Sequence, residues 1–301
     1  MQLVSVIVPN FNHAQFLPKR IESIINQTYS NIEVIILDDC STDNSRDIID
    51  NYAKRDDRIK LVYNSSNSGN TFLQWKKGID LAIGEYLWIA ESDDYSDIHF
   101  LENLINVMNK NRGVNLVYCQ SNFVNVHNEI VGNHIDNLQS LNPTLWLNDF
   151  LMDGNQVLSN YMLIINVIPN AGAVLFKKEL LEKVYWNKLL KFKLGGDRFF
   201  WINVIKDSLV FFVADSFNYF RIDGNTQRKR YINTTTYLNE VSVNVNTICS
   251  QVRVSYKNKF CAVKQWLQYL RIARRMRQES FYKFYFSSFL SFIRLVTIFF
   301  K

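Results

Sequence analysis

Four consecutive residues, Glu91-Ser92-Asp93-Asp94, bring together side chains that could bind a metal. They directly follow the apolar run EYLWIA, which has the length and composition of a buried strand. Open α/β sheets bind ligands beyond the carboxyl ends of their strands, and carboxylates are hard oxygen donors that suit Mg²⁺ or Mn²⁺. The stretch therefore predicts a divalent metal bridging protein carboxylates to phosphates. An exposed acidic turn is the alternative.

Two more polar clusters follow predicted strands nearer the N-terminus. Pro9-Asn10-Phe11-Asn12 follows LVSVIV, where an aromatic ring at the sheet edge could stack on a base. Asp38 and Asp39 follow EVIIL, where a carboxylate could accept a base N–H. Phe11 could instead belong to the core, and the aspartates could cap a helix. Three polar clusters at the ends of three successive strands nevertheless favour one shared nucleotide site.

The elements that would position these clusters alternate between strand and helix over the first hundred residues. IKLVY predicts a third strand at 59–63, and a second helix is expected at about 43–54. Apolar residues at helical spacing predict a first and a third helix. Asn12 or His13 is the expected cap of the first helix. The apolar positions are Leu17, Ile21, Ile24 and Ile25 in the first helix and Phe72, Trp75, Ile79 and Ile83 in the third. The pattern predicts a doubly wound, nucleotide-binding α/β half.

Beyond residue 100 the periodicity is weaker. A helix at about 98–110 and a strand VNLVYC are expected, but the Asn-rich stretch that follows has no assignment. AGAVLF predicts a strand and KKELLEKV a helix. Gly195-Gly196-Asp197 then opens the predicted helix RFFWINVI, and SLVFFV and FNYFRI predict two more strands.

The net charge of +6 is unevenly distributed along the chain. Residues 252–301 contain eleven Lys or Arg and one acidic residue, Glu279, which gives this tail a net charge of +10 and leaves −4 for the first 251 residues. The basic character therefore belongs to the tail and not to the body. We accordingly expect no nucleic acid among the partners, because binding it would require a basic surface on the folded body.

The tail joins the basic, helix-forming section WLQYLRIARRMRQ to FYKFYFSSFLSFIRLVTIFFK, which is rich in Phe and Tyr. Lys283 and Arg294 interrupt the second section, so it falls short of the roughly 20 apolar residues expected of a transmembrane helix. Cationic residues beside aromatic ones are typical of a helix that lies on anionic lipid. A helix packed on the body and an oligomer contact are the alternatives.

The cysteines and the N-terminal residues bear on localisation. Cys40, Cys119, Cys249 and Cys261 show neither CxxC spacing nor a framework of short spacings, so they indicate no zinc site and no disulfide scaffold. MQLVSVIVPN lacks a basic region and a cleavage site, and we interpret it as the first strand. These features predict a cytoplasmic protein, which the tail would place peripherally at the inner face of the cell membrane.

Three segments, VSVIVPNFN, INQTYSNIEVIILDDCSTDNS and NSGNTFLQWKKGIDLAIGEYLWIAESDD, closely resemble the family 2 glycosyltransferases of GT-A fold. The resemblance implies a Rossmann-like, mainly parallel sheet flanked by helices. It also implies a sugar transferase that uses a nucleotide-sugar donor, with a UDP-sugar expected, and Mn²⁺ or Mg²⁺. On the family pattern Pro9-Asn10-Phe11-Asn12 and Asp39 bind the nucleotide. Asp93 meets the ribose or the metal, and Asp94 ligates the metal.

Only short motifs of the second half resemble the family. Gly196-Asp197 resembles its acidic catalytic motif, which implies that Asp197 is the general base for the acceptor hydroxyl; a helix cap is the alternative. FRIDGNT resembles a motif in which His stands two residues after Arg, and here Asp223 takes the His position as a metal ligand. Arg221 and Lys77 are candidate diphosphate contacts, with a structural ion pair and a solvated helix face as the respective alternatives.

Together these observations predict an inverting glycosyltransferase that moves a sugar to a hydroxyl of a glycan or lipid-linked acceptor in cell-surface polysaccharide synthesis. Residues 1–100 would form the donor half, 101–230 the acceptor-binding and catalytic half, and 231–301 the helical tail. No GxGxxG and no glycine-rich triphosphate loop follows the first strand, which disfavours a dehydrogenase and a nucleotidyltransferase. A non-catalytic nucleotide-sugar- or glycan-binding protein on the same fold remains the alternative.

Overall fold

The computed structural model describes residues 2–222, 234–275 and 281–300. The chain forms two compact units of three segments each. The first comprises Met1–Leu151, Ile168–Glu182 and Leu209–Ile222, and the second comprises Met152–Val167, Lys183–Ser208 and Asp223–Lys301. This grouping differs from the functional division at residues 100 and 230 suggested by the sequence, and that division stays a prediction.

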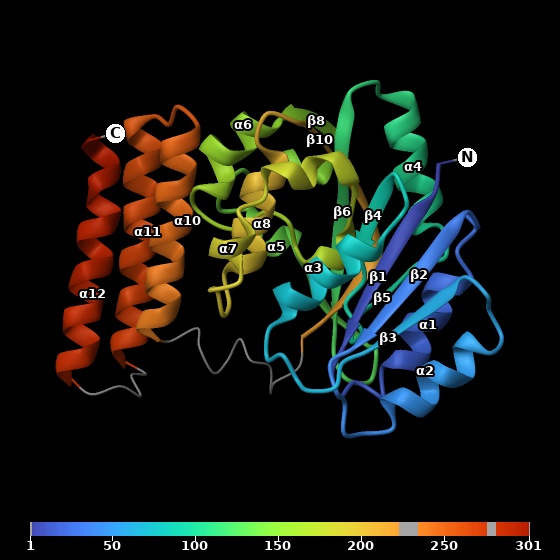
Figure 1. The fold of residues 1–301 in the computed structure, drawn as a ribbon. Helices are drawn as coiled ribbons and strands as arrows, with labels where there is room; N and C mark the ends of the chain where they lie inside the picture. The colour runs from blue at the N-terminus through green and yellow to red at the C-terminus, as the bar shows by residue number, and fades with distance from the viewer. Residues whose placement is uncertain (1, 223–233, 276–280, 301) are drawn as a thin grey trace. The chain divides into compact units, whose positions relative to one another are not determined.

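A mixed β-sheet forms the centre of the first unit (Figure 1). Its strands run in the order β3-β2-β1-β4-β9-β6-β10-β5, with β7 beside β6. The strands up to β4 are parallel, whereas β9 runs antiparallel to β4 and β6. The strands are β1 (Val4–Asn10), β2 (Ile32–Asp38), β3 (Ile59–Tyr63), β4 (Tyr86–Ile89), β5 (Tyr95–Ser96), β6 (Val114–Val124), β7 (Ile130–Asn133), β9 (Val174–Lys177) and β10 (Leu209–Arg221). A further strand, β8 (Phe150–Asp153), spans the boundary between the two units.

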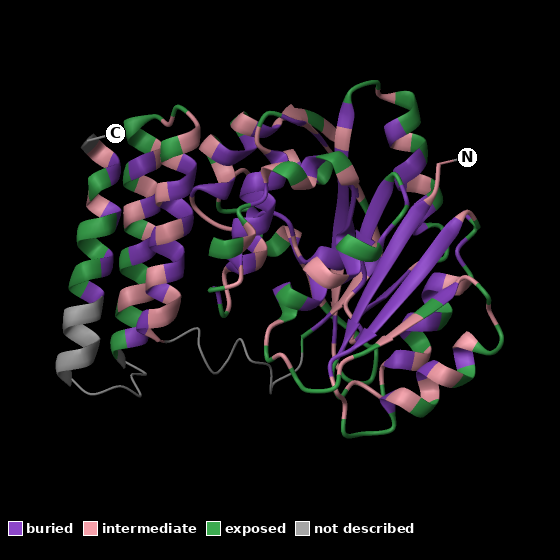
Figure 2. Ribbon diagram, viewed as in Figure 1, coloured by how far each residue is buried: buried purple, intermediate pink, exposed green. Residues whose placement is uncertain are grey.

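Register brings the predicted strand ends to one edge of this sheet. Asn10 pairs with Asp38, and Ile7 pairs with Ile89, the last residue of β4. β1 and β2 are buried along their whole length (Figure 2), as expected of β-branched strands covered on both faces. The carboxyl ends of β1, β2 and β4 therefore lie side by side, as the sequence predicted.

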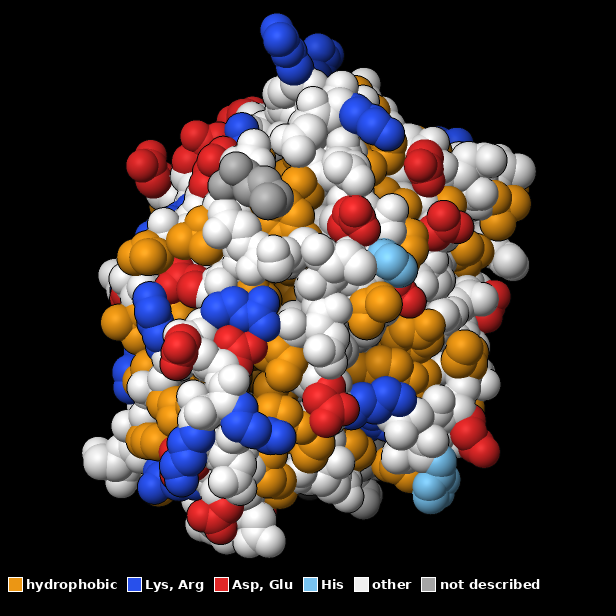
Figure 3. All heavy atoms as spheres, turned by 90° about the vertical axis from the view of Figure 1, so that its right-hand side faces the viewer, with side chains coloured by type: hydrophobic (Ala, Val, Ile, Leu, Met, Phe, Trp, Pro, Cys, Tyr) orange, Lys and Arg blue, Asp and Glu red, His pale blue; other side chains and the backbone are white. Residues whose placement is uncertain are grey.

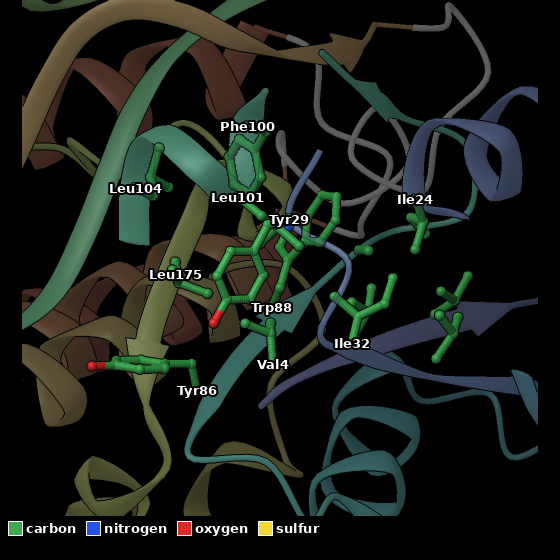
Figure 4. Close-up of a cluster of buried hydrophobic side chains, with 14 of the residues drawn as sticks. Val4, Ile24, Tyr29, Ile32, Tyr86, Trp88, Phe100, Leu101, Leu104 and Leu175 are labelled. Carbon is green, nitrogen blue, oxygen red and sulfur yellow. The ribbon is translucent and has the colours of Figure 1, made fainter. Parts of the chain in front are cut away.

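Helices cover both faces of the parallel strands. Val4, Val6 and Val8 join a cluster with residues of α1, α2 and α4, part of which Figure 4 shows. On the other face α3 approaches so closely that a Cβ on Gly78 would lie 2.4 Å from Cγ2 of Ile7. The helices and helical turns of this unit are α1 (Leu17–Ile25), α2 (Ser45–Ala53), α3 (Thr71–Leu81), α4 (Phe100–Lys110), α5 (Ile135–Leu138), η1 (Leu145–Leu147), η3 (Ala171–Ala173) and η4 (Lys178–Lys183).

Acidic and basic side chains are interspersed on the surface of this unit. Figure 3 shows this for the face that lies to the right in Figure 1, where the two kinds alternate among hydrophobic side chains. The charge on this face is thus locally balanced, in keeping with the small net charge of the first 251 residues.

Five predicted elements differ in detail. SLVFFV and FNYFRI form one strand, β10, because bulges around Ser216 keep its polar centre within the ladder. KKELLEKV forms the 3-10 turn η4, and AGAVLF begins with the turn η3 before β9. Ile83, predicted to be an inward residue of the third helix, lies beyond the end of α3 and is 71% exposed.

The expected cap of the first helix is also corrected. Phe16 is the N-cap of α1, and no side chain caps it. Asn12 cannot serve because its Oδ1 accepts hydrogen bonds from Thr42 N and Oγ1. Nδ1 of His13 lies 2.8 Å from Oγ of Ser92. Both side chains therefore join loops at the sheet edge, and proline in the first turn starts the helix instead.

The second unit is helical in its described part. Its elements are α6 (Gly154–Val157), the π-helical turn η2 (Leu158–Met162), α7 (Trp186–Leu189), α8 (Gly196–Ile205), α10 (Thr235–Gln251), α11 (Tyr256–Arg275), α12 (Phe281–Val296) and η5 (Thr297–Phe300). All residues of α8 except Asp197 are buried, which suits its apolar sequence. The helices α10, α11 and α12 lie side by side (Figure 1).

Helix α12 packs on α10 through small polar residues and turns large apolar residues outward. Oγ of Ser291 donates to Oδ1 of Asn239, and Nδ2 of Asn246 donates to the carbonyl of Arg294. Phe289 and Ile293, on the opposite side of α12, are 59% and 46% exposed. Within the residues that the structure describes, no helix has both the length and the apolar content needed to cross a bilayer.

Candidate functional site

The end of β1 is held in place by the loop that follows β2. Nδ2 of Asn10, which is almost fully buried, donates to Oδ2 of Asp38 and to Oγ of Ser41. Asn12 adopts a left-handed conformation, with φ 55°, and turns the chain away from the sheet. Pro9 is buried within β1, whereas Phe11 is 42% exposed. The turn thus presents an aromatic ring at the sheet edge, where base stacking was predicted.

The two aspartates after β2 have different surroundings. Asp38 accepts hydrogen bonds from Arg46 Nε at 2.8 Å, Ser41 N at 3.0 Å and the Asn10 amide. Burial alone would raise the pKa of Asp38, but the hydrogen bonds from Ser41, Arg46 and Asn10 outweigh it and hold the pKa below its usual value. Asp38 therefore fixes the strand end as a carboxylate.

Asp39 organises the loop between β3 and α3. Its carboxylate accepts hydrogen bonds from Nδ2 of Asn64 at 2.6 Å, from N and Oγ of Ser68 at 2.9 and 2.7 Å, and from Nε2 of Gln74 at 3.1 Å. Three of these hydrogen bonds go to Oδ1, and only the one from Oγ of Ser68 goes to Oδ2, which keeps acceptor capacity for a further donor. A base N–H, as predicted, would therefore bind at Oδ2 of Asp39.

The acidic stretch after β4 contains one carboxylate that faces inward and one at the surface. Asp94 is 2% exposed, and its two oxygens accept hydrogen bonds from Nδ2 of Asn170 at 2.6 Å and from the backbone N of Arg221 at 2.8 Å. The carboxylate of Asp93 is partly exposed and accepts no hydrogen bond from any residue that the structure describes. Asp93 is thus the better placed of the two for a metal.

A buried arginine lies close to this stretch. Arg20 on α1 is 0% exposed, and none of its guanidinium nitrogens has a hydrogen-bond partner among the described residues. Burial lowers its pKa to about 10, opposed by the charges of Asp94, Glu91 and Asp93, so Arg20 stays cationic at neutral pH. Burial, with the adjacent charge of Asp93, raises the pKa of Asp94 well above its usual range, and Arg20 opposes this rise.

Arg221 at the end of β10 acts within the fold. It is 3% exposed, and its guanidinium donates to the carbonyl of Asp93 at 2.8 Å, to Oδ1 of Asn128 at 2.7 Å and to the carbonyl of Asn125. These contacts join the acidic stretch to the turn between β6 and β7. Among the described residues the guanidinium of Arg221 bonds to carbonyl oxygens and forms no ion pair, so the structural ion pair is not observed and the diphosphate contact stays a prediction.

The remaining residues of the stretch are also oriented by neighbours. Nε1 of Trp75 on α3 donates to Oε1 of Glu91 at 2.7 Å, and His13 contacts Ser92. Sequence reasoning placed Trp75 in the core and His13 at a helix cap. It missed Arg20, although a charged residue between Leu17 and Ile21 on the apolar stripe of a helix is a signal that could have identified it.

Three predicted site residues lie away from the acidic stretch or outside the residues that the structure describes. Nζ of Lys77 donates to Oδ1 of Asn64 at 2.5 Å, which ties it to the loop that Asp39 organises. Asp223, a predicted metal ligand, lies outside the described residues. Asp197 belongs to the second unit and is considered next.

Asp197 lies in the first turn of α8, and Gly195 is the N-cap, so the alternative role of Asp197 as a cap is not observed. Its Oδ2 accepts a hydrogen bond from Nδ2 of Asn166 at 3.1 Å, and its Oδ1 accepts one from the backbone N of Arg198 at 2.7 Å. The carboxylate is thus oriented by its own unit and only half-buried, which is compatible with proton transfer.

The donor set fits a hard divalent cation. Glu91 and Asp93 offer partly exposed carboxylate oxygens, and Mg²⁺ or Mn²⁺ in nucleotide sites uses one or two carboxylates together with the phosphates. Among the described residues no group of three or more His, Cys, Asp or Glu is arranged to hold a metal without such a ligand. All four cysteines, which fall in the described part, are free thiols.

Comparison with known proteins gives one family. Residues 5–184 match the profile described as Glycosyl transferase family 2. Glycosyltransferase GlyG of Streptococcus pneumoniae serotype 4 is 40% identical over 103 residues, which make up 34% of this chain and 34% of that protein. The GalNAc(5)-diNAcBac-PP-undecaprenol beta-1,3-glucosyltransferase of Campylobacter jejuni is 26% identical over 227 residues, which cover 74% of this chain and 65% of that protein. The chain spans 34% to 59% of the length of the first curated relatives it matches.

Solved structures show the same fold. S. aureus TarS 1-349 in complex with UDP-GlcNAc has a TM-score of 0.73 at 14% identity, covering 99% of this chain and 81% of that one. The mannosyltransferase PcManGT from Pyrobaculum calidifontis in complex with GDP-Man and Mn²⁺ has a TM-score of 0.59 at 16% identity, and the match covers 98% of this chain and 85% of that one. At such identities the likeness concerns the fold alone, and it confirms the predicted GT-A α/β fold. Because the family profile covers more than half of the sequence, the chain belongs to glycosyl transferase family 2.

Proposed function

We propose that the protein is a glycosyltransferase that moves a sugar from a nucleoside-diphosphate sugar to a hydroxyl of a glycan or lipid-linked acceptor. The observation that carries this proposal is the meeting of Phe11, Asp39 and Asp93 at one sheet edge in a chain of this family. Structural relatives bound to UDP-GlcNAc and to GDP-Man with Mn²⁺ support it. We expect a UDP-sugar donor and an acceptor in cell-surface polysaccharide synthesis. TarS bound to UDP-GlcNAc supports the donor, and the Campylobacter relative, named for a PP-undecaprenol-linked glycan, supports a lipid-linked acceptor.

Each residue has a proposed role. Phe11 stacks on the base, with Pro9, Asn10 and Asn12 forming the turn around it. Asp39 contacts the base and holds the loop beside it. Asp93, with Glu91 nearby, holds Mg²⁺ or Mn²⁺, which when bound neutralises charge on the departing diphosphate. Asp94 is buried and stabilises the acidic stretch through the hydrogen bonds that it accepts from Asn170 and Arg221, whereas the sequence predicted that it ligates the metal.

Asp197 is the proposed general base. A carboxylate within hydrogen-bond reach of the acceptor hydroxyl can take its proton as the oxygen attacks the anomeric carbon. Direct displacement by that oxygen inverts the anomeric centre. The hydrogen bond from Asn166 would orient the carboxylate without neutralising it.

A nucleotide panel tests the proposal. Because a ligand that binds only the folded state raises its thermal stability, we would measure the melting temperature with UDP, GDP, dTDP and CMP, each with and without Mn²⁺. We expect UDP to stabilise the wild type only with Mn²⁺ and to lose this effect in Asp93→Asn. If no nucleotide stabilises the wild type, the proposed nucleotide-binding site is wrong. Metal-dependent binding without any turnover would favour the non-catalytic alternative.

We also propose that the enzyme works at the inner face of the cell membrane, with α11 and α12 against anionic lipid. Phe289 and Ile293 supply an outward apolar face, and Lys264 and Arg271 on α11 are exposed cations. Phe289→Ser/Ile293→Ser should reduce sedimentation with phosphatidylserine vesicles, whereas Ile83→Ser, at an exposed apolar site of the first unit, should not. Equal sedimentation of all three proteins would return α12 to the packed-helix or oligomer-contact alternatives.

A further inference from the structure

Glu240 on the tail helix α10 binds the backbone segment that precedes α8. Its carboxylate is mostly buried, with the residue 7% exposed, and it accepts hydrogen bonds from three consecutive backbone amides. The donors are N of Lys193 at 2.6 Å, N of Leu194 at 3.0 Å and N of Gly195 at 2.7 Å. One side chain therefore fixes the orientation of three successive peptide groups.

These peptide groups lead directly into α8. Gly195 is the N-cap of that helix, and backbone amides at a helix start lack partners within the helix. The partial positive charge at a helix N-terminus also favours a carboxylate there. Glu240 thus holds the segment by charge-assisted hydrogen bonds, which are stronger than bonds between neutral groups.

A second residue of α10 binds the next peptide group, on the other side of Gly195. Nδ2 of Asn244, one helical turn after Glu240, donates to the carbonyl of Gly195 at 3.0 Å. A Cβ on Gly195 would lie 3.2 Å from that Nδ2 and 3.5 Å from Oε2 of Glu240. The approach of α10 to the N-cap is therefore tight on the Asn244 side and of ordinary contact distance on the Glu240 side, and a side chain at residue 195 would crowd Asn244.

Asp197 comes two residues after the held peptide. Its position depends on where α8 begins, because Gly195, Gly196 and Asp197 are consecutive and the helix ladder starts among them. Glycine is the most conformationally free residue, so the Gly195-Gly196 pair would give this point little rigidity by itself. The contacts from Glu240 and Asn244 supply the missing constraint.

We infer that Glu240, assisted by Asn244, is a positioning residue for Asp197, so that the C-terminal helix α10 is part of the catalytic apparatus. The inference rests on the proposed function, because it assumes that Asp197 acts as the base. Glu240 and Asn244, which lie more than forty residues after Asp197 in the chain, would then determine where its carboxylate lies. Glu240 itself need not touch the substrate.

The test compares variants of the full-length chain. With UDP-GlcNAc or UDP-glucose and Mn²⁺, we would measure kcat and KM for donor turnover in the wild type, Glu240→Ala, Glu240→Gln and Asn244→Ala. Asn246→Ala is the matched control, since Asn246 lies on the same helix but donates to Arg294 of α12. Amide hydrogen exchange at 193–195 and the melting temperature would be recorded for each.

We expect Glu240→Ala to lower kcat by about 10² with the donor KM within roughly twofold, since small displacements of a catalytic group cost about this much. Exchange at 193–195 should accelerate in the same variant. Glu240→Gln keeps one carbonyl acceptor and should lie between alanine and wild type. Asn246→Ala should leave kcat and this exchange unchanged.

Two results would overturn the inference. One is unchanged kcat in Glu240→Ala despite faster exchange at 193–195, and the other is a loss of kcat in Asn246→Ala as large as in Glu240→Ala. Asp197→Asn separates this failure from failure of the proposed function. If Asp197→Asn is inactive while Glu240→Ala is fully active, only the positioning role falls. If Asp197→Asn is fully active, the proposed base itself is wrong.

Discussion

The acidic stretch after β4 and the segment before Asp197 both support a candidate reactive carboxylate, but by different means. At the end of β4 the support is a matter of burial and charge, since buried Asp94 has the cation Arg20 to oppose the rise in its pKa and accepts a hydrogen bond from the backbone N of Arg221. Before Asp197 the support is a matter of backbone position, with Glu240 bound to three amides. The first arrangement decides which groups are ionised, and the second decides where one group lies.

The difference predicts different responses to substitution. Removing a buried charge leaves its partners without compensation, so changes at the first region should appear mainly in stability and in its pH dependence. Removing a carboxylate that orders a backbone segment should appear mainly in turnover. The proposed tests of Glu240 address the second region, a prediction at Arg221 addresses the first, and a prediction at Asp38 extends it to the neighbouring end of β2.

The largest stability effect is expected at Arg221. Arg221→Met would leave the carbonyls of Asp93 and Asn125 and the side chain of Asn128 without their donor. Because hydrogen bonds to charged groups contribute about 1.5–3 kcal/mol each, we expect the free energy of unfolding to fall by about 3 kcal/mol or more. Urea denaturation with an unchanged m-value would measure it. A variant as stable as the wild type that fails to bind nucleotide would instead support the diphosphate contact.

A smaller, pH-dependent effect is expected at Asp38. Its pKa in the folded state lies below the usual 3.8, so between these two values the unfolded state binds more protons and stability rises with pH. The contribution of Asp38 is therefore present above about pH 4 and is lost as the pH falls through the folded pKa. Asp38→Asn should reduce the free energy of unfolding by about 2 kcal/mol near pH 7 and by less near pH 3.

Asp80→Asn provides the control for Asp38→Asn and the smallest expected effect. Asp80 forms an exposed i,i+4 ion pair with Lys76, and such pairs contribute about 0.3–0.5 kcal/mol. Urea denaturation at both pH values should show a change of about this size. If both variants lose the same free energy of unfolding at neutral pH, the buried network around Asp38 contributes no more stability than an exposed ion pair.

Local sequence patterns were sufficient to predict the fold of the first hundred residues. β1, β2 and β4 are continuous apolar runs, and parallel strands place their carboxyl ends at one edge whatever the details of packing. The polar residues after each run could therefore be assigned to one site. Residues 120–170 form short strands and turns held by distant contacts, and their sequence shows no period that could have revealed them.

The roles within the site were harder to predict because they depend on burial and on distant partners. The letters Asp93-Asp94 do not reveal which carboxylate points inward, since Asn170 and the backbone of Arg221 decide it. Nor does any motif mark Glu240, whose partners lie 45 to 47 residues earlier in the chain. Tertiary contacts of this kind leave no spacing signal in a single sequence.

We propose that carboxylates of this chain support metal-dependent sugar transfer. The most direct test is release of UDP from UDP-GlcNAc and UDP-glucose by the wild type, Asp93→Asn and Asp197→Asn, with Mn²⁺ and with EDTA. We predict release by the wild type only with Mn²⁺, little release by Asp93→Asn, and a fall of about 10²–10⁴ in Asp197→Asn with donor affinity retained. Equal release by all three proteins, or release that survives EDTA, would contradict the account.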